Sequence, residues 1–423
     1  MRVAVLAGAG SAVVALGVFL NGAGSEAPAA PVPVVVPAWP DWAQQLQADI
    51  DPLTELGTSD DALWAGLPTV DARAGGAIGD GIADDADALQ AQLDSLSAGG
   101  TLLLDGGVFV QSRCLHIANA HVRLLGRSAR LHASNADDMC ISLDGEGTQL
   151  EGLELTAKTN ERGEQLEQSR VVVRGRGTKV IGNQLRGSTS AAIMIFGAQD
   201  YAIVGNRVAD TLSDGIHSTY GVSNGYVAHN VTDNTGDDGI AVVSYGNETQ
   251  CSHVLIEDNE VSNVSWARGI SVVGSADIVV RHNKVTGTGR AAGIIVTREE
   301  SYKTHGVDRV VIADNTVSEV GKRFHRLDQT GQAAIDLNAV VAPTPELQVR
   351  NVLVAGNTIF DGRYDGIRME GGVCQATLIG NHIRRMGENG IAVANPACTP
   401  TISLCAANDI DRTWGDPPAC RVQ

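Results

Sequence analysis

The chain has 423 residues, of which 43% are hydrophobic and only 4% aromatic, and it contains 49 glycines. This length exceeds the usual size of one domain unless the architecture grows by repetition. Few aromatic residues and many small or β-branched ones fit a narrow, layered β core. The formal net charge of −18 argues against nucleic acid or an anionic membrane as a partner of the whole surface.

The first segment has the pattern of a secretion signal. Residues 1–29 contain an early Arg2, an apolar run from Val3 to Leu20 and small residues after it, which is typical of a signal peptide. An uncleaved anchor is the alternative, because the run is almost long enough to span a bilayer. We expect a secreted or periplasmic protein whose mature form is not in a membrane. Residues 30–67 lack clear periodicity, which predicts a linker or a packed arm.

A short helix is expected at the start of the main domain. Residues 79–95 are GDGIADDADALQAQLDS, in which Asp84 or Asp85 can cap a helix with apolar positions Ala88, Leu89 and Leu93. Such a helix would cover the apolar end of a stack of strands, which is otherwise exposed.

From about residue 100 the chain repeats itself with a basic step of 23 or 24 residues. A short strand, a turn with Asn and a second short strand in about 23 residues describe one rung of a parallel β-helix. Asn suits the turn because its amide tolerates a left-handed conformation and can hydrogen-bond to its equivalent one rung on. The repeated residues are Asn183, Asn206, Asn230, Asn259, Asn283, Asn315, Asn357, Asn381 and Asn408, alternating with Ile193, Ile216, Ile240, Ile270, Ile294, Ile335, Ile367 and Ile391.

These features resemble the pectate-lyase superfamily, in which GDGxxDD and a short helix open a right-handed parallel β-helix. The resemblance covers roughly residues 68–415. It implies an all-β fold, with one right-handed parallel β-helix domain over residues 68–423 and a capping helix at its N-terminal end. Asp80, Asp84 and Asp85 belong to the motif, and we expect them to be structural.

The cysteines are compatible with export. Cys374, Cys398, Cys405 and Cys420 predict a disulfide-rich C-terminal cap, and one of the seven cysteines must be left over or pair between chains. The sequence contains no CxxC motif and no His/Cys ligand spacing, so no zinc site is expected.

Candidate catalytic residues lie where a turn meets the next strand. SDGIH (213–217) and TGDDGIAV (235–242) occupy the same place on consecutive rungs, so Asp214 and Asp238 should stack, with Asp237 beside them. Three carboxylates this close should raise at least one pKa and could act as acid and base in glycosidic cleavage. The alternative is turn chemistry, because Asp365 and Asn389 occur at the same place in later rungs.

The local pattern is similar to family 28 glycoside hydrolases, the polygalacturonase type, in which NTDG, GDD and GHGISIGS follow on successive rungs. Here LSDG (212–215), GDDGIAV (236–242) and RGISVVGS (268–275) follow in that order. The resemblance implies that Asp214, Asp237 and Asp238 are the catalytic carboxylates. The family's His after GDD is replaced by Arg268, and its RIK segment, which contacts the uronate, has no counterpart.

Other side chains are expected around these carboxylates. His217 could act as a general base. Basic loops beside acidic groups suit an anionic sugar chain, and the candidate substrate-binding residues are Arg268, Arg298, Tyr220, Tyr245, Lys303 and Arg368. Arg368 belongs to a second outer cluster with Asp336, Tyr364 and Glu370, which is either a sugar subsite or a solvated set of ion pairs.

The sequence therefore favours an enzyme that hydrolyses a polysaccharide containing uronate, without a cofactor. A second hypothesis is a polysaccharide lyase or C5-epimerase on the same fold, in which Asp214, Asp237 and Asp238 hold Ca²⁺. A third is a non-catalytic carbohydrate-binding surface protein, because several outward positions are apolar and poor sugar ligands. These positions are Ala241, Val243, Val273 and Ile295.

Overall fold

The computed structural model describes residues 38–58, 60–321, 329–340, 342, 344–398, 407–411 and 420–422. The chain divides into two units, residues 1–38 and 39–423, and every element below belongs to the second unit. The predicted signal peptide, residues 1–29, lies outside the described residues. Within the described ranges, no helix is long and apolar enough to cross a membrane.

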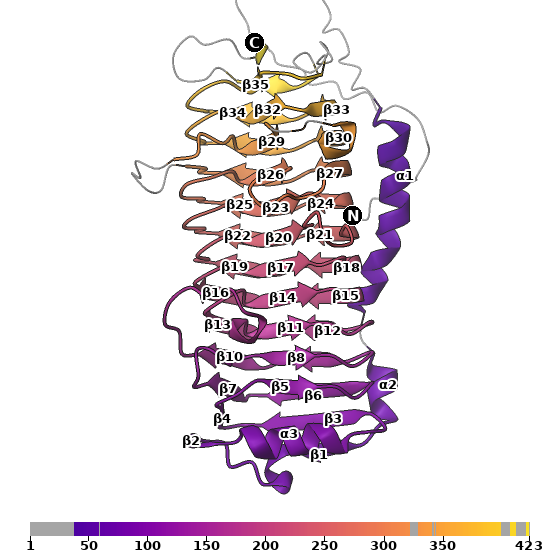
Figure 1. Cartoon of the computed structure of the whole chain (residues 1–423), viewed down its shortest axis with the longest axis vertical. Coiled ribbons are helices and arrows are strands. Elements are labelled where there is room, and N and C mark those ends of the chain that lie inside the picture. Colours follow the sequence, from indigo (N-terminus) through magenta and orange to yellow (C-terminus); the bar gives the residue numbers. More distant parts are fainter. Residues whose placement is uncertain are drawn as a thin grey trace, which may run out of the picture. The chain divides into compact units, whose positions relative to one another are not determined.

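Short parallel strands stack into three sheets, A, B and C, with 12, 13 and 12 strands in the described part of the chain (Figure 1). Sheet A contains β1 (Thr69–Asp71), β3 (Gly100–Asp105), β6 (Val122–Arg127), β9 (Gln149–Glu151), β12 (Lys179–Ile181), β15 (Gln199–Val204), β18 (Ser223–Ala228), β21 (Ser252–Glu257), β24 (Ala276–Arg281), β27 (Val307–Ala313), β30 (Val349–Ala355) and β33 (Val373–Ile379). Sheet B contains β2 (Asp80–Asp84), β4 (Val108–Gln111), β7 (Arg130–Ala133), β10 (Glu154–Ala157), β13 (Gln184–Ser188), β16 (Arg207–Thr211), β19 (Val231–Asp233), β22 (Glu260–Ser262), β25 (Lys284–Thr286), β28 (Thr316–Ser318), β31 (Thr358–Phe360), β34 (His382–Arg384) and β36 (Asp409–Ile410). Sheet C contains β5 (Leu115–Ile117), β8 (Ile141–Leu143), β11 (Val171–Val173), β14 (Ile193–Phe196), β17 (Ile216–Thr219), β20 (Ile240–Val243), β23 (Ile270–Val273), β26 (Ile294–Thr297), β29 (Ile335–Ala339), β32 (Ile367–Gly371), β35 (Ile391–Ala394) and β37 (Cys420–Val422).

One strand from each sheet makes a rung, and the chain climbs from A to B to C before the next rung begins. The repeated isoleucines of sheet C are paired in register from Ile193 to Ile391 and are buried in one continuous core. The parallel β-helix predicted from the repeat is confirmed.

The repeated asparagines form a ladder through the same core. Asn206, for example, donates its side-chain amide to Asn230 Oδ1 at 3.0 Å, and its own Oδ1 accepts the backbone N–H of Asn183 at 3.0 Å. This confirms the predicted bonding between rungs. The predicted left-handed conformation is wrong by one position, because the preceding residue adopts it at each repeated Asn from Asn183 to Asn381. Gly205, His229 and Asp258 have φ of 69°, 56° and 52°.

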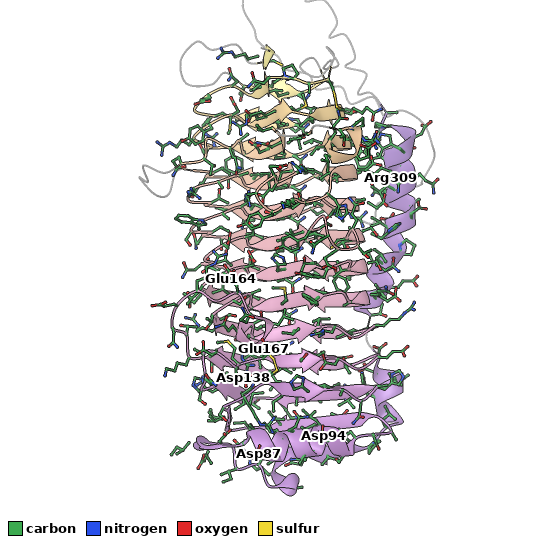
Figure 2. All side chains as sticks on the ribbon, viewed as in Figure 1. Asp87, Asp94, Asp138, Glu164, Glu167 and Arg309 are labelled. Atoms are coloured by element: carbon green, nitrogen blue, oxygen red, sulfur yellow. A yellow bond between two sulfur atoms is a disulfide. The ribbon has the colours of Figure 1, made fainter. Side chains whose placement is uncertain are left out.

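The N-terminal end and one side of the coil are covered by helices. The predicted capping helix is α3 (Ala86–Ser95), which buries Leu89 and Leu93 on the core and leaves Asp87 and Asp94 exposed (Figure 2). Residues 41–57 and 61–65, within the segment predicted to be a linker or an arm, form α1 (Asp41–Ile50), η1 (Asp51–Gly57) and α2 (Asp61–Ala65). Helix α1 packs its apolar side on the outer face of sheet A.

The motif aspartates are structural, as expected. Asp85 accepts the backbone N–H groups of Ile78 and Val110, and Asp84 that of Ala86. The remaining short helices are η2 (Ala72–Gly75), η3 (Leu166–Gln168) and η4 (Pro345–Leu347).

Disulfides cross-link both ends of the coil. Cys374–Cys398 and a disulfide-bonded Cys420 lie at the predicted C-terminal cap, while Cys405 lies outside the described residues. Cys114–Cys140, which was not predicted, joins early rungs. The cysteine left over is Cys251, which is buried.

Candidate active site

Three carboxylates meet in the turns between sheets B and C. Asp214 precedes β17, and Asp237 and Asp238 precede β20 on the next rung. Each offers an oxygen atom within 4.8 Å of an oxygen of the other two. Two oxygens at that separation can both bind one water molecule. The predicted approach of Asp214, Asp237 and Asp238 is therefore present in the structure.

The structure also agrees with the alternative that these aspartates stabilise turns. This role uses only one oxygen of Asp214 and one of Asp238. Asp214 Oδ1 accepts the backbone N–H of Asp238 at 2.9 Å, and Asp238 Oδ1 accepts that of Arg268 at 2.9 Å. The same bond joins Asp365 to the backbone of Asn389 at 2.8 Å, far from the acidic cluster. An Asp before the repeated Gly is thus a structural acceptor at Asp214, Asp238 and Asp365, and this bond uses one oxygen of the carboxylate.

Asp214 and His217 form a buried pair. His217 Nδ1 lies 2.8 Å from Asp214 Oδ2, and 12% of each side chain is exposed. Burial lowers the pKa of His217, but Asp214 and the neighbouring carboxylates outweigh it, so the pKa is raised overall. Because both oxygens of Asp214 have partners, it is poorly placed to exchange a proton with a ligand.

Asp237 is held by an arginine that the sequence analysis did not find. Arg162 comes from the 158–165 loop after β10 and forms an ion pair with Asp237, 75 residues further along the chain. The sequence shows only that the segment between β10 and β11 is longer than an ordinary turn between strands. The repeat gives no indication that Arg162 reaches a carboxylate three rungs further along the coil.

Asp238 lies beside a second ion pair. Arg268 Nη1 is 3.9 Å from Asp238 Oδ2, and Arg268 also pairs with Glu299 from the loop after β26. Arg268 therefore lies in the site, as expected, but its charge is already shared between two carboxylates. Glu299 was not predicted.

The two adjacent aspartates have perturbed pKa values. Burial raises the pKa of Asp238 to about 7; Arg268 opposes the rise, and Asp237 and Asp214 add to it. Burial and the charge of Asp214 also raise the pKa of Asp237, against the lowering effect of Arg162. The pKa values of both adjacent aspartates are therefore raised, and Arg162 counteracts the rise at Asp237.

The other predicted binding residues are spread over the outer face. Tyr220 and Tyr245 belong to an aromatic row with Phe196 and Tyr302, with ring centroids 4.1, 5.7 and 6.5 Å apart. Lys303 is exposed on the 298–306 loop. This row borders the acidic cluster, and burial raises the pKa of Tyr245 to about 12, with Asp214 contributing.

Arg298 and Arg368 lie in other surroundings. Arg298 is 7% exposed and pairs with Glu300, and its Nε lies 3.4 Å from the carbonyl of Thr304. Arg368 pairs with Asp336 at 3.0 Å and with Glu370 at 3.3 Å, several rungs beyond Asp238. The structure thus places neither guanidinium beside the three carboxylates.

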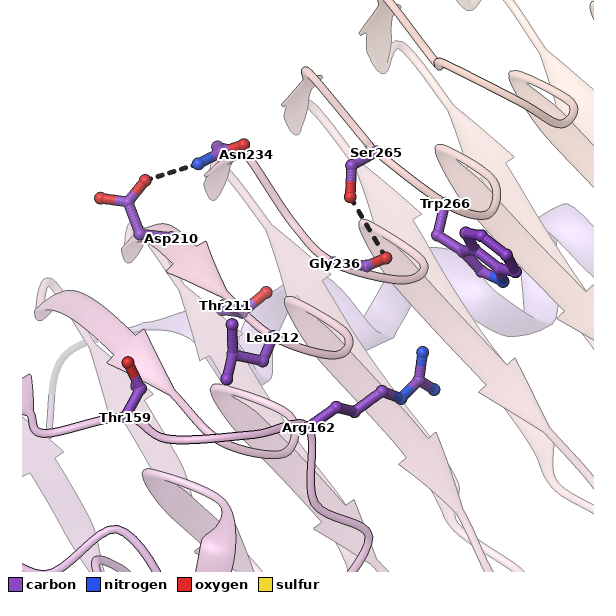
Figure 3. Close-up of a pocket in the computed structure, with 9 residues that line it drawn as sticks. All are labelled: Thr159, Arg162, Asp210, Thr211, Leu212, Asn234, Gly236, Ser265 and Trp266. Atoms are coloured by element: carbon purple, nitrogen blue, oxygen red, sulfur yellow. Dashed lines mark hydrogen bonds between the residues drawn. The ribbon is translucent and has the colours of Figure 1, made fainter. Parts of the chain in front are cut away.

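A pocket of about 820 Å³ is lined by Arg162, the ion-pair partner of Asp237, and by Gly236, the residue before it (Figure 3). In Figure 3, Arg162 extends towards the side where Trp266 lies. Trp266 is 42% exposed, and Cζ of Arg290 lies 4.2 Å from the centroid of its ring. Trp266 was not predicted. The full lining is Thr159, Arg162, Asp210, Thr211, Leu212, Asn234, Gly236, Ser265 and Trp266.

Comparison with known proteins identifies the architecture. A family profile described as "Right handed beta helix region" matches residues 130–317. The fold is a right-handed parallel β-helix. Among curated proteins, none matches the sequence.

Three solved structures are similar to this β-helix. The catalytic unit of a thermostable GH87 α-1,3-glucanase from Streptomyces thermodiastaticus is 19% identical, with TM-score 0.59 over 82% of this chain and 70% of that chain. An exopolygalacturonase from Thermotoga maritima is 15% identical, with TM-score 0.58 over 84% and 96%. PfbA, a surface adhesin of Streptococcus pneumoniae, is 15% identical, with TM-score 0.55 over 77% and 92%. Likeness at this level of identity shows the fold alone.

The Arg162–Asp237 ion pair predicts a specific pH effect. If Asp237 must be ionised for activity, Arg162→Gln will move the acidic limb of the kcat/KM profile to higher pH, because Arg162 lowers the pKa of Asp237. The basic limb, near pH 7 from Asp238, will stay in place. Arg176→Gln, which breaks a similar ion pair with Asp200 outside the site, is the control. An identical shift in both variants would contradict this assignment.

Proposed function

We propose that the chain is a glycoside hydrolase that cleaves a polysaccharide by carboxylate acid/base catalysis. The observation that supports this is the cluster of Asp214, Asp237 and Asp238, with oxygens within 4.8 Å of one another and one pKa raised to about 7. The turn bond uses a single carboxylate oxygen where an Asp makes it, as at Asp365, so it does not require the extra carboxylate of Asp237.

Asp238 is the general acid in this proposal. Its Oδ1 accepts a backbone N–H, while Oδ2, which lies 3.9 Å from Arg268 Nη1, carries the proton in this proposal. Because its pKa lies near 7, the group is protonated in mildly acidic solution. It gives that proton to the glycosidic oxygen as the bond to the anomeric carbon breaks.

Asp237 is the base that activates water. Arg162 binds one of its oxygens and favours the ionised form, and the second oxygen accepts a proton from the water that attacks the anomeric carbon. Asp214 is a positioning residue: it holds the backbone of Asp238 and the ring of His217. Its negative charge also helps to keep the proton on Asp238.

An anionic sugar is compatible with this proposal but is not required by it. Arg162 and Arg268 pair with Asp237 and Glu299, so a uronate would have to compete with a protein carboxylate for either guanidinium. A suitable substrate panel therefore contains neutral glycans as well as polyuronates.

A calcium-dependent lyase or C5-epimerase is the second candidate. Three carboxylate oxygens within 4.8 Å of one another could ligate one Ca²⁺. Against this, both oxygens of Asp214 are bonded to groups of the protein and Arg162 neutralises Asp237. Hydrolysis is therefore the better-supported proposal.

The test follows reducing ends and the ultraviolet absorbance of unsaturated uronate over the panel, with and without chelator. Hydrolysis predicts reducing ends without absorbance, insensitivity to chelator and loss of activity in Asp237→Asn. Absorbance that rises together with the reducing ends would instead identify a lyase, and sensitivity to chelator would make the aspartates metal ligands.

A further inference from the structure

The outer face of sheet C is covered on both sides of the acidic cluster. On the side towards the N-terminus, the outward side chains Ser142 and Val172 are 3% and 2% exposed. On the side towards the C-terminus, Ala241 and Ser271 are 0% exposed and Ile295 is 1% exposed. Between them, Met194 and His217 are partly exposed. The floor of the site therefore spans only the strands β14 and β17.

The 298–306 loop covers the side towards the C-terminus. Thr304 pairs with Tyr245 in an antiparallel bridge, and Gly246 donates its N–H to the carbonyl of Lys303 at 2.9 Å. Glu299 fixes the start of the loop to Arg268. Beneath it, Val243 and Val273 pack with Tyr245 in an apolar cluster outside the main core. This cover explains the apolar outward positions that suggested a non-catalytic protein.

The 158–169 segment covers the side towards the N-terminus. Leu166 packs on Val172 and on the Cys114–Cys140 disulfide. The backbone carbonyl of Glu167 accepts the backbone N–H of Met139 at 2.8 Å. Figure 2 labels Glu164 and Glu167 in this segment. From here Arg162 extends over the intervening turns to Asp237. A long glycan lying along the coil would collide with one loop or the other.

One opening next to the 158–169 segment is the pocket lined by Arg162 and Trp266. Its volume of about 820 Å³ lies within the range of about 300–1,000 Å³ usual for small-molecule sites. On the opposite side, beyond the ends of β14, β17 and β20, stands the aromatic row that includes Phe196, Tyr220 and Tyr245.

From this enclosure, which rests on the proposed hydrolase function, we infer that the protein acts on glycan chain ends (exo action). The terminal sugars enter the pocket, whose lining includes Arg162 and Trp266, and the bond that reaches Asp237 and Asp238 is cleaved. The rest of the polymer stays outside the two loops. Cleavage within a chain would require both sides of the scissile bond to continue along a floor that the loops cover.

The experiment compares viscosity with sugar release on the best polymer of the panel. Exo action predicts one small product from the first time point and a loss of viscosity no greater than the fraction of sugar released. A reducing-end-tagged oligosaccharide should lose one unit of fixed size per step. The Asp237→Asn protein, prepared in the same way, supplies the background to subtract.

Two other outcomes are distinguishable. Rapid loss of viscosity with a broad mixture of oligosaccharides would overturn exo action while leaving the hydrolase proposal intact. Absence of products from every glycan would overturn the hydrolase proposal and exo action with it.

Discussion

Asp238→Asn will lose activity by about 10²- to 10⁴-fold, the usual contribution of a general acid, and it will become more stable than the wild type at neutral pH. The amide keeps an oxygen that can accept the backbone N–H of Arg268, so the turn is preserved. It lacks only the acidic proton that the proposed mechanism transfers.

The stability effect has a definite sign. The pKa of Asp238 is raised from 3.8 to about 7 in the folded protein, so between these values the folded state binds a proton that the unfolded state has lost. Wild-type stability then falls as pH rises through this window, by about 4 kcal/mol. The variant has no such group, so its stability relative to wild type increases over the same window and is constant above it.

Thermal or urea unfolding at pH 4 and pH 8, together with kcat/KM, measures both effects. Asp365→Asn is the matched control, because Asp365 makes the same turn bond to Asn389 but lies outside the cluster. The control should retain activity. An active Asp238→Asn, or one that is less stable than wild type at pH 8, would contradict the assignment.

Asn259→Ala will destabilise the coil by at least about 3 kcal/mol. The Asn259 amide is 1% exposed; its nitrogen donates to the carbonyls of Val227 and Glu257 and to Asn283 Oδ1, and its oxygen accepts from Asn230. Alanine leaves several buried donors and acceptors without partners, and each costs about 1–3 kcal/mol.

The urea midpoint measures this change. Asn247→Ala, on the exposed loop after β20, should shift stability by less than about 0.5 kcal/mol. Equal midpoints for the two variants would mean that the ladder contributes little to stability.

The sequence repeat was sufficient to predict most of the fold, because each rung uses the same residue types for the same contacts. An Ile at each sheet C strand and an Asn at each turn fix the register of the whole stack. The same periodicity placed Asp214 and Asp238 one rung apart, and that placement agrees with the structure. The conformation of the Asn turn was missed because the left-handed residue before it varies between Gly, His and Asp.

The surroundings of the carboxylates could not be predicted in the same way. Arg162, Glu299 and Trp266 reach the site from segments that interrupt the repeat, and periodicity contains no information about the path of an insertion. Arg298 was expected in the site for its charge, whereas the loop folds it inward onto Glu300.

Cleavage in water enriched in heavy oxygen, followed by mass spectrometry of the products, tests the central claim most directly. If Asp237 activates water and Asp238 protonates the leaving oxygen, each bond broken will add one heavy oxygen atom at the new chain end, and Asp237→Asn will abolish its incorporation. Unsaturated products without heavy oxygen would contradict hydrolysis and assign these aspartates to a lyase.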